Sequence, residues 1–574
     1  MSKGSQEHRG AMLRQVPLLV VVCSVAIGCG RSTEPDREAR RERAASRQGS
    51  SLAGMRQQLL AGAVSILSEL DRYDQERAAE QVFDRLNQWS HAAAGAGRVT
   101  EAAPDPLLES LPDELQAAGQ AILARPLFDA TGDILAIRDR CWLAAIARSV
   151  SSEAVDDLTL AEQLFAWTVR SLAPASDPPM VPTEAVPGSR WFLPGEILLA
   201  GRGSGPQRAW IFIELLRQAG LEAVMLATPG GPGTPPRPWL PAVLIDGKAY
   251  LFEPTYGMPV PGPDGARVAT LRQAADDPAI LRALSVPGRP YPVTADDLDE
   301  LAVLVVADPW SLAARMQRLD EPLASDHGIR VGVRATDEAA RAEASLTGHA
   351  DGPVVSQRGL WAFPWETVAR RSLAAAPLQD ELGPLEVPVP DPQREKTGGL
   401  FRPLFAGRVR EFRGDLDGPG GAKEAYLAAR VSRRAMNAAV ANLPEPQAKA
   451  ISGRLTRMKE DATYWLGLAM LAEGQDEAAD DYLGRMILDN IPDSRWADAA
   501  RINLAPALVR LGRPDEAAAL LRGDRSPQRF GSRLLADRID PRDEAPPELP
   551  RDTAPPEENA EENAAPVAPR DAAG

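Results

Sequence analysis

The sequence has 574 residues, 44% of them apolar, and 64 Lys and Arg against 80 Asp and Glu, which gives a net charge of −16. This length allows about two to four domains with hydrophobic cores, and the acidic balance argues against a duplex-DNA binder, so we expect no nucleic-acid partner. Three Cys and four His, none at zinc-ligand spacing, predict neither a metal site nor a bound cofactor.

The amino terminus has the pattern of an export signal. Basic residues precede an apolar run over residues 16–27, and small residues with Cys29 follow. A run of about 12 apolar residues is too short to span a bilayer as a helix. Residues 26–29 (AIGC) resemble the bacterial lipobox, which implies that the signal peptide, residues 1–28, is removed and that Cys29 is lipidated; the alternative is an ordinary signal or anchor with an unmodified Cys. We therefore expect an exported, lipid-anchored protein at the cell membrane or the periplasm-facing envelope, with residues 29–52 as a flexible polar tether.

Helical patterns fill residues 53–172. Apolar residues recur there at spacings of three and four, which predicts one buried face per helix. The helix predicted at residues 134–149 contains Cys141, which we expect to be a core thiol, because no His is near it in sequence. A Pro-rich stretch over residues 174–188 ends the region. The first predicted helix has Leu59, Leu60, Val64, Leu67 and Leu70 on one face. The further predicted helices are residues 76–89, 115–123, 134–149 and 158–171.

Residues 173–300 are predicted to mix helix and strand. Pro206 is placed to begin a helix and Gly220 to end it. Asp246-Gly247 is a two-residue turn signal, which joins two strands into a hairpin. The predicted strands are residues 222–227, 239–245 and 248–253.

This order of elements resembles the transglutaminase-like superfamily, which has a papain-like fold. In that family a Gly-rich loop brings a Cys to the start of a helix that ends in LLRxxGI, a later strand carries a His, and an acid lies in a DPT motif. Residues 215–221 (LLRQAGL) match the helix end, and EPTYG stands in place of the acid motif. Counting from these matches, the Cys position falls on Gly205, the His position on Arg237 or Pro238, and the acid on Glu253.

The resemblance implies the family's fold without its thiol chemistry. Cys and His are both missing from their positions, and no His occurs between residues 91 and 327. We expect a degenerate, non-catalytic domain, a pseudoenzyme, whose groove holds a peptide or protein strand. The candidate groove residues are Ser204, Gly205, Gln207, Trp210, Arg237, Trp239, Glu253 and Tyr256.

A further α+β segment is predicted over residues 301–390, followed by a linker over residues 391–421. The segment is expected to contain a strand at residues 301–306 and a helix at residues 309–319. Its second predicted strand shows the alternating apolar pattern Ile329, Val331, Val333.

Residues 422–536 carry a helical pattern that repeats. A helix, a Gly turn and an Asp-Glu-Ala-Ala helix start occur around Gly474 and again 38 residues later around Gly512. This unit resembles a tetratricopeptide repeat, which implies a surface for a protein or peptide partner; the alternative is a plain helical bundle. Residues 537–574 are Pro-rich and acidic, and we expect a disordered tail.

The predicted fold class is therefore multidomain α+β, with a helical N-terminal region, a transglutaminase-like domain, a tetratricopeptide-like C-terminal region and a disordered tail. The predicted function is binding or scaffolding at the envelope, with the membrane contacted through the N-terminal lipid. Two alternatives stay open. One is an active hydrolase or acyltransferase with a relocated nucleophile such as Ser204, assisted by His327 or His349. The other is a purely structural protein without a ligand.

Overall fold

The computed structural model describes residues 52–94, 104–177, 190–231, 234–265, 267–348, 353–390 and 400–541. Met1–Gln57 and Gln58–Gly574 form two units, and the features below belong to the second. The predicted signal peptide, Cys29, His349 and the tail from residue 542 onward lie outside the described residues, as does the predicted tether up to residue 51.

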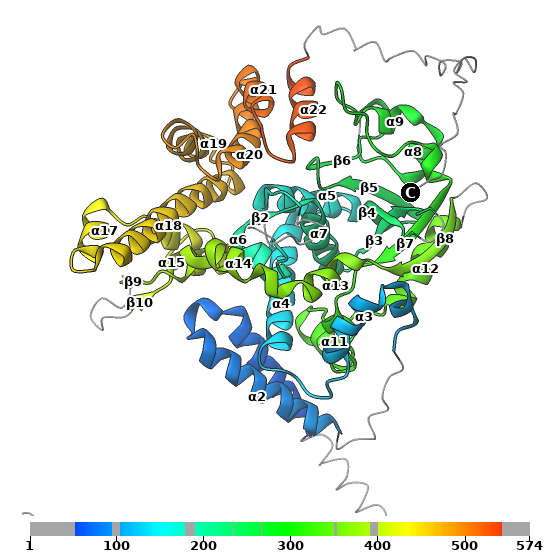
Figure 1. The fold of residues 1–574 in the computed structure, drawn as a ribbon, viewed down its shortest axis with the longest axis horizontal. Coiled ribbons are helices and arrows are strands. Elements are labelled where there is room, and N and C mark those ends of the chain that lie inside the picture. Colours follow the sequence, from blue (N-terminus) through cyan, green and yellow to red (C-terminus); the bar gives the residue numbers. More distant parts are fainter. Residues whose placement is uncertain are drawn as a thin grey trace, which may run out of the picture. The chain divides into compact units, whose positions relative to one another are not determined.

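A mixed six-stranded sheet contains the predicted hairpin (Figure 1). The strand order is β6-β5-β4-β3-β7-β8, with β7 and β8 parallel and the other pairs antiparallel. Asp246 and Gly247 both have positive φ, 50° and 72°, as a tight two-residue hairpin turn requires. The strands are β3 (Glu222–Thr228), β4 (Arg237–Ile245), β5 (Lys248–Glu253), β6 (Met258–Pro259), β7 (Glu300–Val305) and β8 (Val354–Leu360).

The domain boundary predicted at residue 300 is wrong, because β7 lies in the middle of this sheet. It pairs with β3 on one side and with β8 on the other. The residues predicted as a separate α+β segment therefore complete the sheet of the preceding region. Pairing between strands about 75 positions apart in sequence leaves no local signal, which is why the boundary was misplaced.

The strand predicted from Ile329, Val331 and Val333 is also not formed. These residues are buried, but the backbone between two helices is bonded mainly by side chains instead of a neighbouring strand. The amide of Val331 donates to Asp320 Oδ1 at 2.7 Å, and that of Arg330 to Gln218 Oε1 at 2.9 Å. The alternating apolar pattern of Ile329, Val331 and Val333 therefore indicates a segment with one buried face and not a paired strand.

Helices cover both faces of the sheet. Each predicted N-terminal helix lies inside an observed one, and Gly220 ends α7 in the left-handed conformation, with φ of 82°. The predicted helix at residues 309–319 is interrupted at Ala313, where the chain is extended. The helices up to residue 390 are α2 (Gln75–Ala94), α3 (Asp113–Leu123), α4 (Gly132–Val150), α5 (Asp157–Ser171), α6 (Pro194–Ala200), α7 (Gly205–Ala219), α8 (Leu271–Asp276), α9 (Pro278–Arg282), α10 (Pro309–Leu312), α11 (Ala314–His327), α12 (Ala335–Thr347), α13 (Ala362–Ala369) and α14 (Ala375–Leu382).

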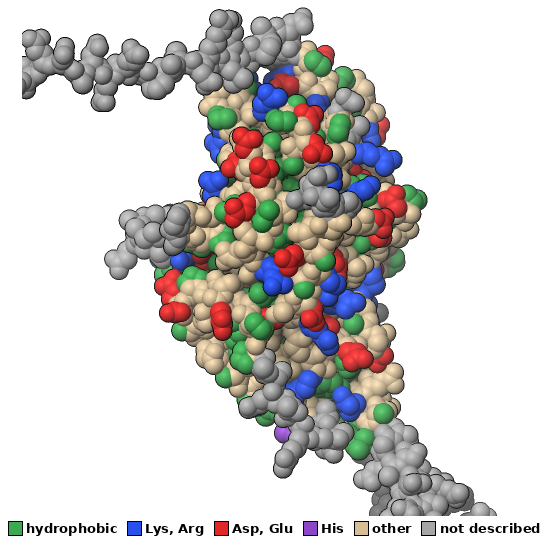
Figure 2. Space-filling model, turned by 90° about the vertical axis from the view of Figure 1, so that its right-hand side faces the viewer, with side chains coloured by type: hydrophobic (Ala, Val, Ile, Leu, Met, Phe, Trp, Pro, Cys, Tyr) green, Lys and Arg blue, Asp and Glu red, His purple; other side chains and the backbone are tan. Residues whose placement is uncertain are grey.

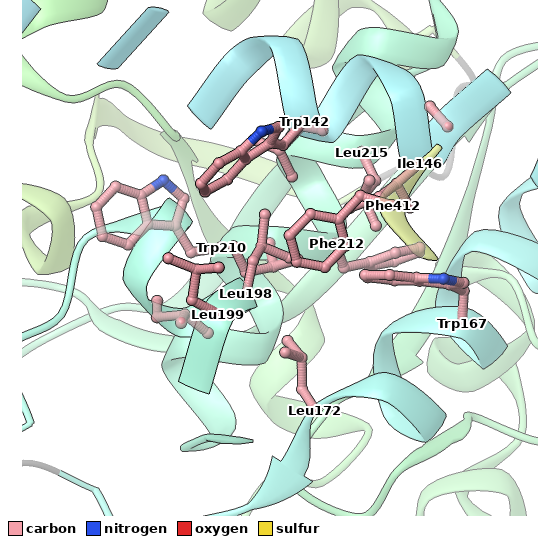
Figure 3. Close-up of a cluster of buried hydrophobic side chains, with 14 of the residues drawn as sticks. Trp142, Ile146, Trp167, Leu172, Leu198, Leu199, Trp210, Phe212, Leu215 and Phe412 are labelled. Carbon is pink, nitrogen blue, oxygen red and sulfur yellow. The ribbon is translucent and has the colours of Figure 1, made fainter. Parts of the chain in front are cut away.

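The side chains of β3 alternate between two hydrophobic clusters. Met225 and Ala227 face the larger cluster with α4, α5 and α7, whereas Val224 and Leu226 face α8, α9 and α12. Figure 3 shows Phe212 of α7 among Trp142 of α4, Trp167 and Leu172 at the end of α5, Leu198 of α6 and Phe412, which lies far along the chain. The larger cluster extends from Leu60 to Ala536. The regions predicted as separate modules therefore share one core.

The predicted linker at residues 391–421 contains a buried helix, α15 (Pro403–Phe412). Its apolar residues Leu404, Phe405, Val409 and Phe412 are buried in the shared core. Pro and Gly residues on both sides suggested a linker, but the four apolar residues at helical spacing outweigh them. The short strands β9 (Val389–Pro390) and β10 (Leu400–Phe401) pair just before this helix.

The C-terminal region consists of helices joined by tight turns. Gly474 and Gly512 have φ of 69° and 75°, which confirms the predicted left-handed turns after the first helix of each unit. Among the described helices, none is both long enough and apolar enough to cross a membrane. The elements are α16 (Ala422–Ala429), α17 (Arg433–Val440), α18 (Glu445–Ala472), α19 (Asp476–Ala479) with a π-helix over Asp480–Asp489, α20 (Ala497–Arg510), α21 (Pro514–Arg522) and α22 (Arg529–Ile539).

Candidate functional site

The first turn of α7 is closed by a capping box. The amide of Gln207 donates to Ser204 Oγ at 3.4 Å, and the amide of Ser204 donates to Gln207 Oε1 at 3.1 Å. Burial raises the pKa of the Asp177 carboxylate, while Ser204 and Gly205 act to lower it. Ser204 and Gln207 are both fully buried. Their polar atoms cap the helix, so Ser204 is not placed as an exposed nucleophile.

Gly205 stands where the resemblance places the nucleophile, and a neighbouring side chain fills the space beside it. A Cβ atom at this position would lie 2.4 Å from Thr255 Oγ1. Such a contact is far closer than two such atoms normally approach, so Cys at this position would force Thr255 to move. The glycine permits a close approach between α7 and the loop after β5.

Arg208 occupies the middle of the expected groove, fully buried. A guanidinium has five N–H donors, and here they bond to neutral oxygens: Leu172 O, Val169 O, Pro254 O and Gln528 Oε1, the last at 2.6 Å. Burial lowers the pKa of Arg208 to about 10. This side chain links α5, the loop after β5 and the segment before α22, so the groove predicted to be open is filled.

The C-terminal helix α22 closes the same place from outside. A Cβ atom at Gly531 would lie 1.9 Å from Tyr256 O, and Phe530 packs against the Tyr256 ring with centroids 6.2 Å apart. Figure 1 shows α22 beside β6, next to this loop. Tyr256 is buried. It therefore contacts the chain's own C-terminal helix, and the prediction that it forms an open groove wall is wrong.

Glu253, the residue at the acid position, is joined to two aromatic side chains. Tyr291 donates its hydroxyl hydrogen to Glu253 Oε2 at 2.5 Å, and Trp239 Nε1 donates to the Tyr291 hydroxyl oxygen at 3.0 Å. The amide of Thr255 donates to Glu253 Oε1 at 2.9 Å. Burial raises the pKa of Glu253 and raises that of Tyr291 well above its ordinary value. The network anchors the end of the hairpin.

The other two predicted residues, Trp210 and Arg237, have no hydrogen bond to this network among the described residues. Trp210 is fully buried in the core shared with α4 and α13. Arg237 is exposed at the start of β4, and Trp239 is half-buried. Sequence reasoning missed Arg208, Tyr291 and Gln528. Arg208 follows the nucleophile position by one helical turn, but Gln528 lies 320 residues away and has no signal in the sequence.

Thiol and imidazole groups are absent from this site in the described part of the chain. Cys141 is buried in α4, and burial raises the pKa of its thiol to about 12. His91 lies near the end of α2 and His327 ends α11. No group of three or more His, Cys, Asp or Glu among the described residues could hold a metal ion.

A polar cavity of about 1170 Å³ lies elsewhere, between the turn before α2 and helices α15 and α16. Its arginines are engaged, since Arg410 and Arg413 both bond Asp71 at 3.0 Å and Arg402 pairs with Glu386. The face in Figure 2 also intersperses acidic and basic side chains.

Comparisons with known proteins give no relative to draw on. No family model matches the chain, and neither the curated proteins nor the solved structures contain a match.

Replacing Gln528 by Glu should raise the free energy of unfolding by about 1 kcal/mol, because it supplies an anion to a buried cation. Gln528 Nε2 is buried without a hydrogen-bond partner, and the carboxylate removes that unsatisfied donor. Gln528→Ala is the matched variant and should lower stability by about 1–3 kcal/mol, since it leaves one Arg208 N–H unsatisfied. Urea unfolding compares the three proteins, and a Glu variant less stable than the Ala variant would contradict the expectation.

The variant Glu253→Gln should gain stability relative to the wild type as the pH rises. Because burial raises the pKa of Glu253, the folded protein holds this proton more tightly than the unfolded chain does. The stability that the carboxyl contributes is therefore present below its ordinary pKa of 4.5 and is lost as the pH rises toward the raised value. Urea unfolding at about pH 4 and about pH 7 measures the change. An unchanged stability difference between the two proteins would show that Glu253 does not titrate in this way.

Proposed function

We propose that the protein is a non-catalytic, membrane-anchored lipoprotein of the bacterial envelope, acting as a scaffold for a protein or peptide partner. In this proposal a degenerate transglutaminase-like domain and tetratricopeptide-like helices share one hydrophobic core. The observation that carries it is the filled site at the start of α7, where Gly205 faces Thr255 and Arg208 bonds Gln528 Oε1 at 2.6 Å.

The chemistry of acyl transfer requires a nucleophile, a base and an orienting group that converge on one open site. At this site the Ser204 side chain is buried, and its oxygen accepts from the Gln207 amide as the cap of α7. The Cys141 thiol lies in a separate core helix, and its raised pKa keeps it protonated at neutral pH. These features support a binding or scaffolding role over the relocated-nucleophile alternative.

A turnover assay tests the absence of catalysis. The full chain and its Cys141→Ala, Ser204→Ala and His327→Ala variants are incubated with thioester and amide substrates, and we expect no turnover above the buffer blank in any of them. Gly205→Cys should be inactive as well, because Thr255 obstructs the new side chain. Turnover by the wild type that is lost in any one variant would overturn the proposal.

Fatty-acid labelling tests the proposed lipid anchor. Cells producing the full chain are labelled with a traceable fatty acid, and Cys29→Ala is compared with the wild type. We expect the label to disappear from the variant, whereas a Cys23→Ala control should keep it. Undiminished label on Cys29→Ala would remove the lipid anchor from the proposal.

A further inference from the structure

The hairpin formed by α17 and the first half of α18 is strongly basic. Residues 430–459, named here the basic hairpin, contain seven Lys and Arg against one Glu, which gives a charge of +6 in a chain whose net charge is −16. Figure 1 shows α17 beside the N-terminal part of α18. From residue 431 to residue 454 no side chain is buried. The basic hairpin is thus an exposed surface of one sign.

Most of its cations form no ion pair with another described residue. Arg457 pairs with Asp380, and Arg430 lies over the ring of Tyr482. In the described segments no ion pair involves the other five cations. These five are Arg433, Arg434, Lys449, Arg454 and Lys459.

A small cavity adds a place for an acidic side chain. It has a volume of about 260 Å³ and is lined by Arg454 and Arg457 together with the end of α14. Arg457 is already paired there with Asp380, while Arg454 has no such partner among the described residues. A Glu or Asp side chain entering the cavity would give Arg454 a charge-assisted hydrogen bond.

We propose that the basic hairpin binds an acidic, extended polypeptide, and that its resident occupant is the chain's own carboxyl-terminal segment, residues 542–574. That segment carries nine Asp and Glu against three Arg, a charge of −6 that matches the hairpin's +6. Because it is part of the same chain, its effective concentration at the hairpin is of the order of millimolar, which favours it over a free peptide.

The carboxyl-terminal segment is long enough to reach the basic hairpin. Its densest acidic part ends at Glu562, 21 residues after the last described residue, Pro541, and 21 extended residues reach about 70 Å. The path from the end of α22 crosses α21, α20 and α18, which pack in that order. The distance from the end of α22 to the basic hairpin is about 70 Å as well, the sum of three interaxial distances between packed helices and the length of α18.

Zero-length cross-linking with a carbodiimide tests this inference on the full chain. The reagent joins Lys amines to carboxylates that contact them, and the hairpin offers Lys449 and Lys459. Lys248, the first residue of β5, is exposed and serves as the matched control. We expect peptides that join residues 552–562 to Lys449 or Lys459 to exceed those joined to Lys248. The excess should vanish in about 0.5 M salt, where the Debye length is only a few Å.

Two variants decide between occupants. Replacing Arg433 and Arg434 by Gln keeps both lysines and every tail carboxylate, and it should reduce the hairpin cross-links to the level of Lys248. Equal cross-linking of all three lysines in the wild type would overturn the proposal. Tail neutralisation is the replacement of Glu557, Glu558, Glu561 and Glu562 by Gln. Vesicles of equal phosphatidylglycerol and phosphatidylcholine test a membrane as the occupant, using the Cys29→Ala chain so that no lipid anchor contributes. Tail neutralisation should strengthen vesicle binding by removing the competitor. If tail neutralisation leaves vesicle binding unchanged while Arg433→Gln/Arg434→Gln abolishes it, the membrane is the occupant of the basic hairpin and the proposal fails.

The inference rests on the proposed binding role, because it names the chemistry of the ligand. The two stand or fall on different measurements. Turnover in the acyl-transfer assay would overturn the scaffold proposal and leave the cross-links unchanged, whereas missing cross-links would overturn the acidic ligand and leave the turnover result unchanged.

Discussion

Replacing Asp133 by Ala is expected to lower the free energy of unfolding by about 4 kcal/mol, because it leaves the buried cation of Arg315 without its anion. Asp133 of α4 and Arg315 of α11 form two hydrogen bonds of 2.6 and 2.8 Å, and both side chains have 0% exposure. Arg315 also donates to the carbonyl oxygens of Ile122 and Arg125 at the end of α3. The ion pair therefore connects α4, α11 and the end of α3.

Equilibrium urea unfolding measures this loss, and two comparisons identify its cause. The exposed pair Arg485–Asp481 has side chains 62% and 57% accessible, and Asp481→Ala should cost less than about 1 kcal/mol. The double variant Asp133→Leu/Arg315→Met removes both charges and should recover a large part of the stability, since apolar side chains of similar size can replace a buried ion pair. A loss at Asp133→Ala no larger than that at Asp481→Ala would contradict the expectation.

Trp465→Ala should cost about 3–5 kcal/mol, the range typical of removing a large aromatic side chain from a core. Trp465 of α18 is where the C-terminal helices meet the rest of the protein. The Arg408 guanidinium of α15 lies 3.6 Å from its ring centroid, and the ring of Trp496 lies 5.2 Å away. A Cβ atom at Gly201 would lie 2.0 Å from the indole. The variant therefore leaves a cavity where α18 packs against α15 and against the turn at Gly201.

Limited proteolysis together with urea unfolding measures this effect. We expect cleavage in residues 422–541 at a protease concentration that leaves the wild type intact, because the local opening free energy falls. Leu427→Ala on the exposed side of α16 is the matched control, since Leu427 is 53% accessible, and it should change stability by less than about 0.5 kcal/mol. Equal protease sensitivity of the two variants would show that Trp465 does not fix the C-terminal helices.

Local patterns predicted much of the fold. Apolar spacing identified α4, α5 and α7, and the turn residues Asp246 and Gly247 identified the β4–β5 hairpin, because these elements are specified by residues close together in sequence. The position of β7 beside β3 and the burial of α15 were missed. Both depend on partners far away in the chain, which a sequence window does not contain.

At the candidate site, too, local features were predicted from the sequence and contacts with distant residues were not. The LLRQAGL motif placed Gly205 at the start of a helix and the EPTYG motif placed Glu253 at the end of a strand, as the structure has them. The contents of the space between them were not predictable, because Gln528 and Gly531 reach it from the end of the described chain. An open groove was expected since the motif describes one domain alone. The neighbour that fills it is specified by shape and close packing, which a motif does not encode.

The continuity of the core from Leu60 to Ala536 has a consequence for how the protein is made. Modular chains fold piece by piece as they emerge during synthesis. Here α4 packs against α15, and Trp142 contacts Phe405 and Phe412, so part of that apolar surface stays uncovered until residues 403–412 have been synthesised. A holding chaperone during synthesis would meet this need.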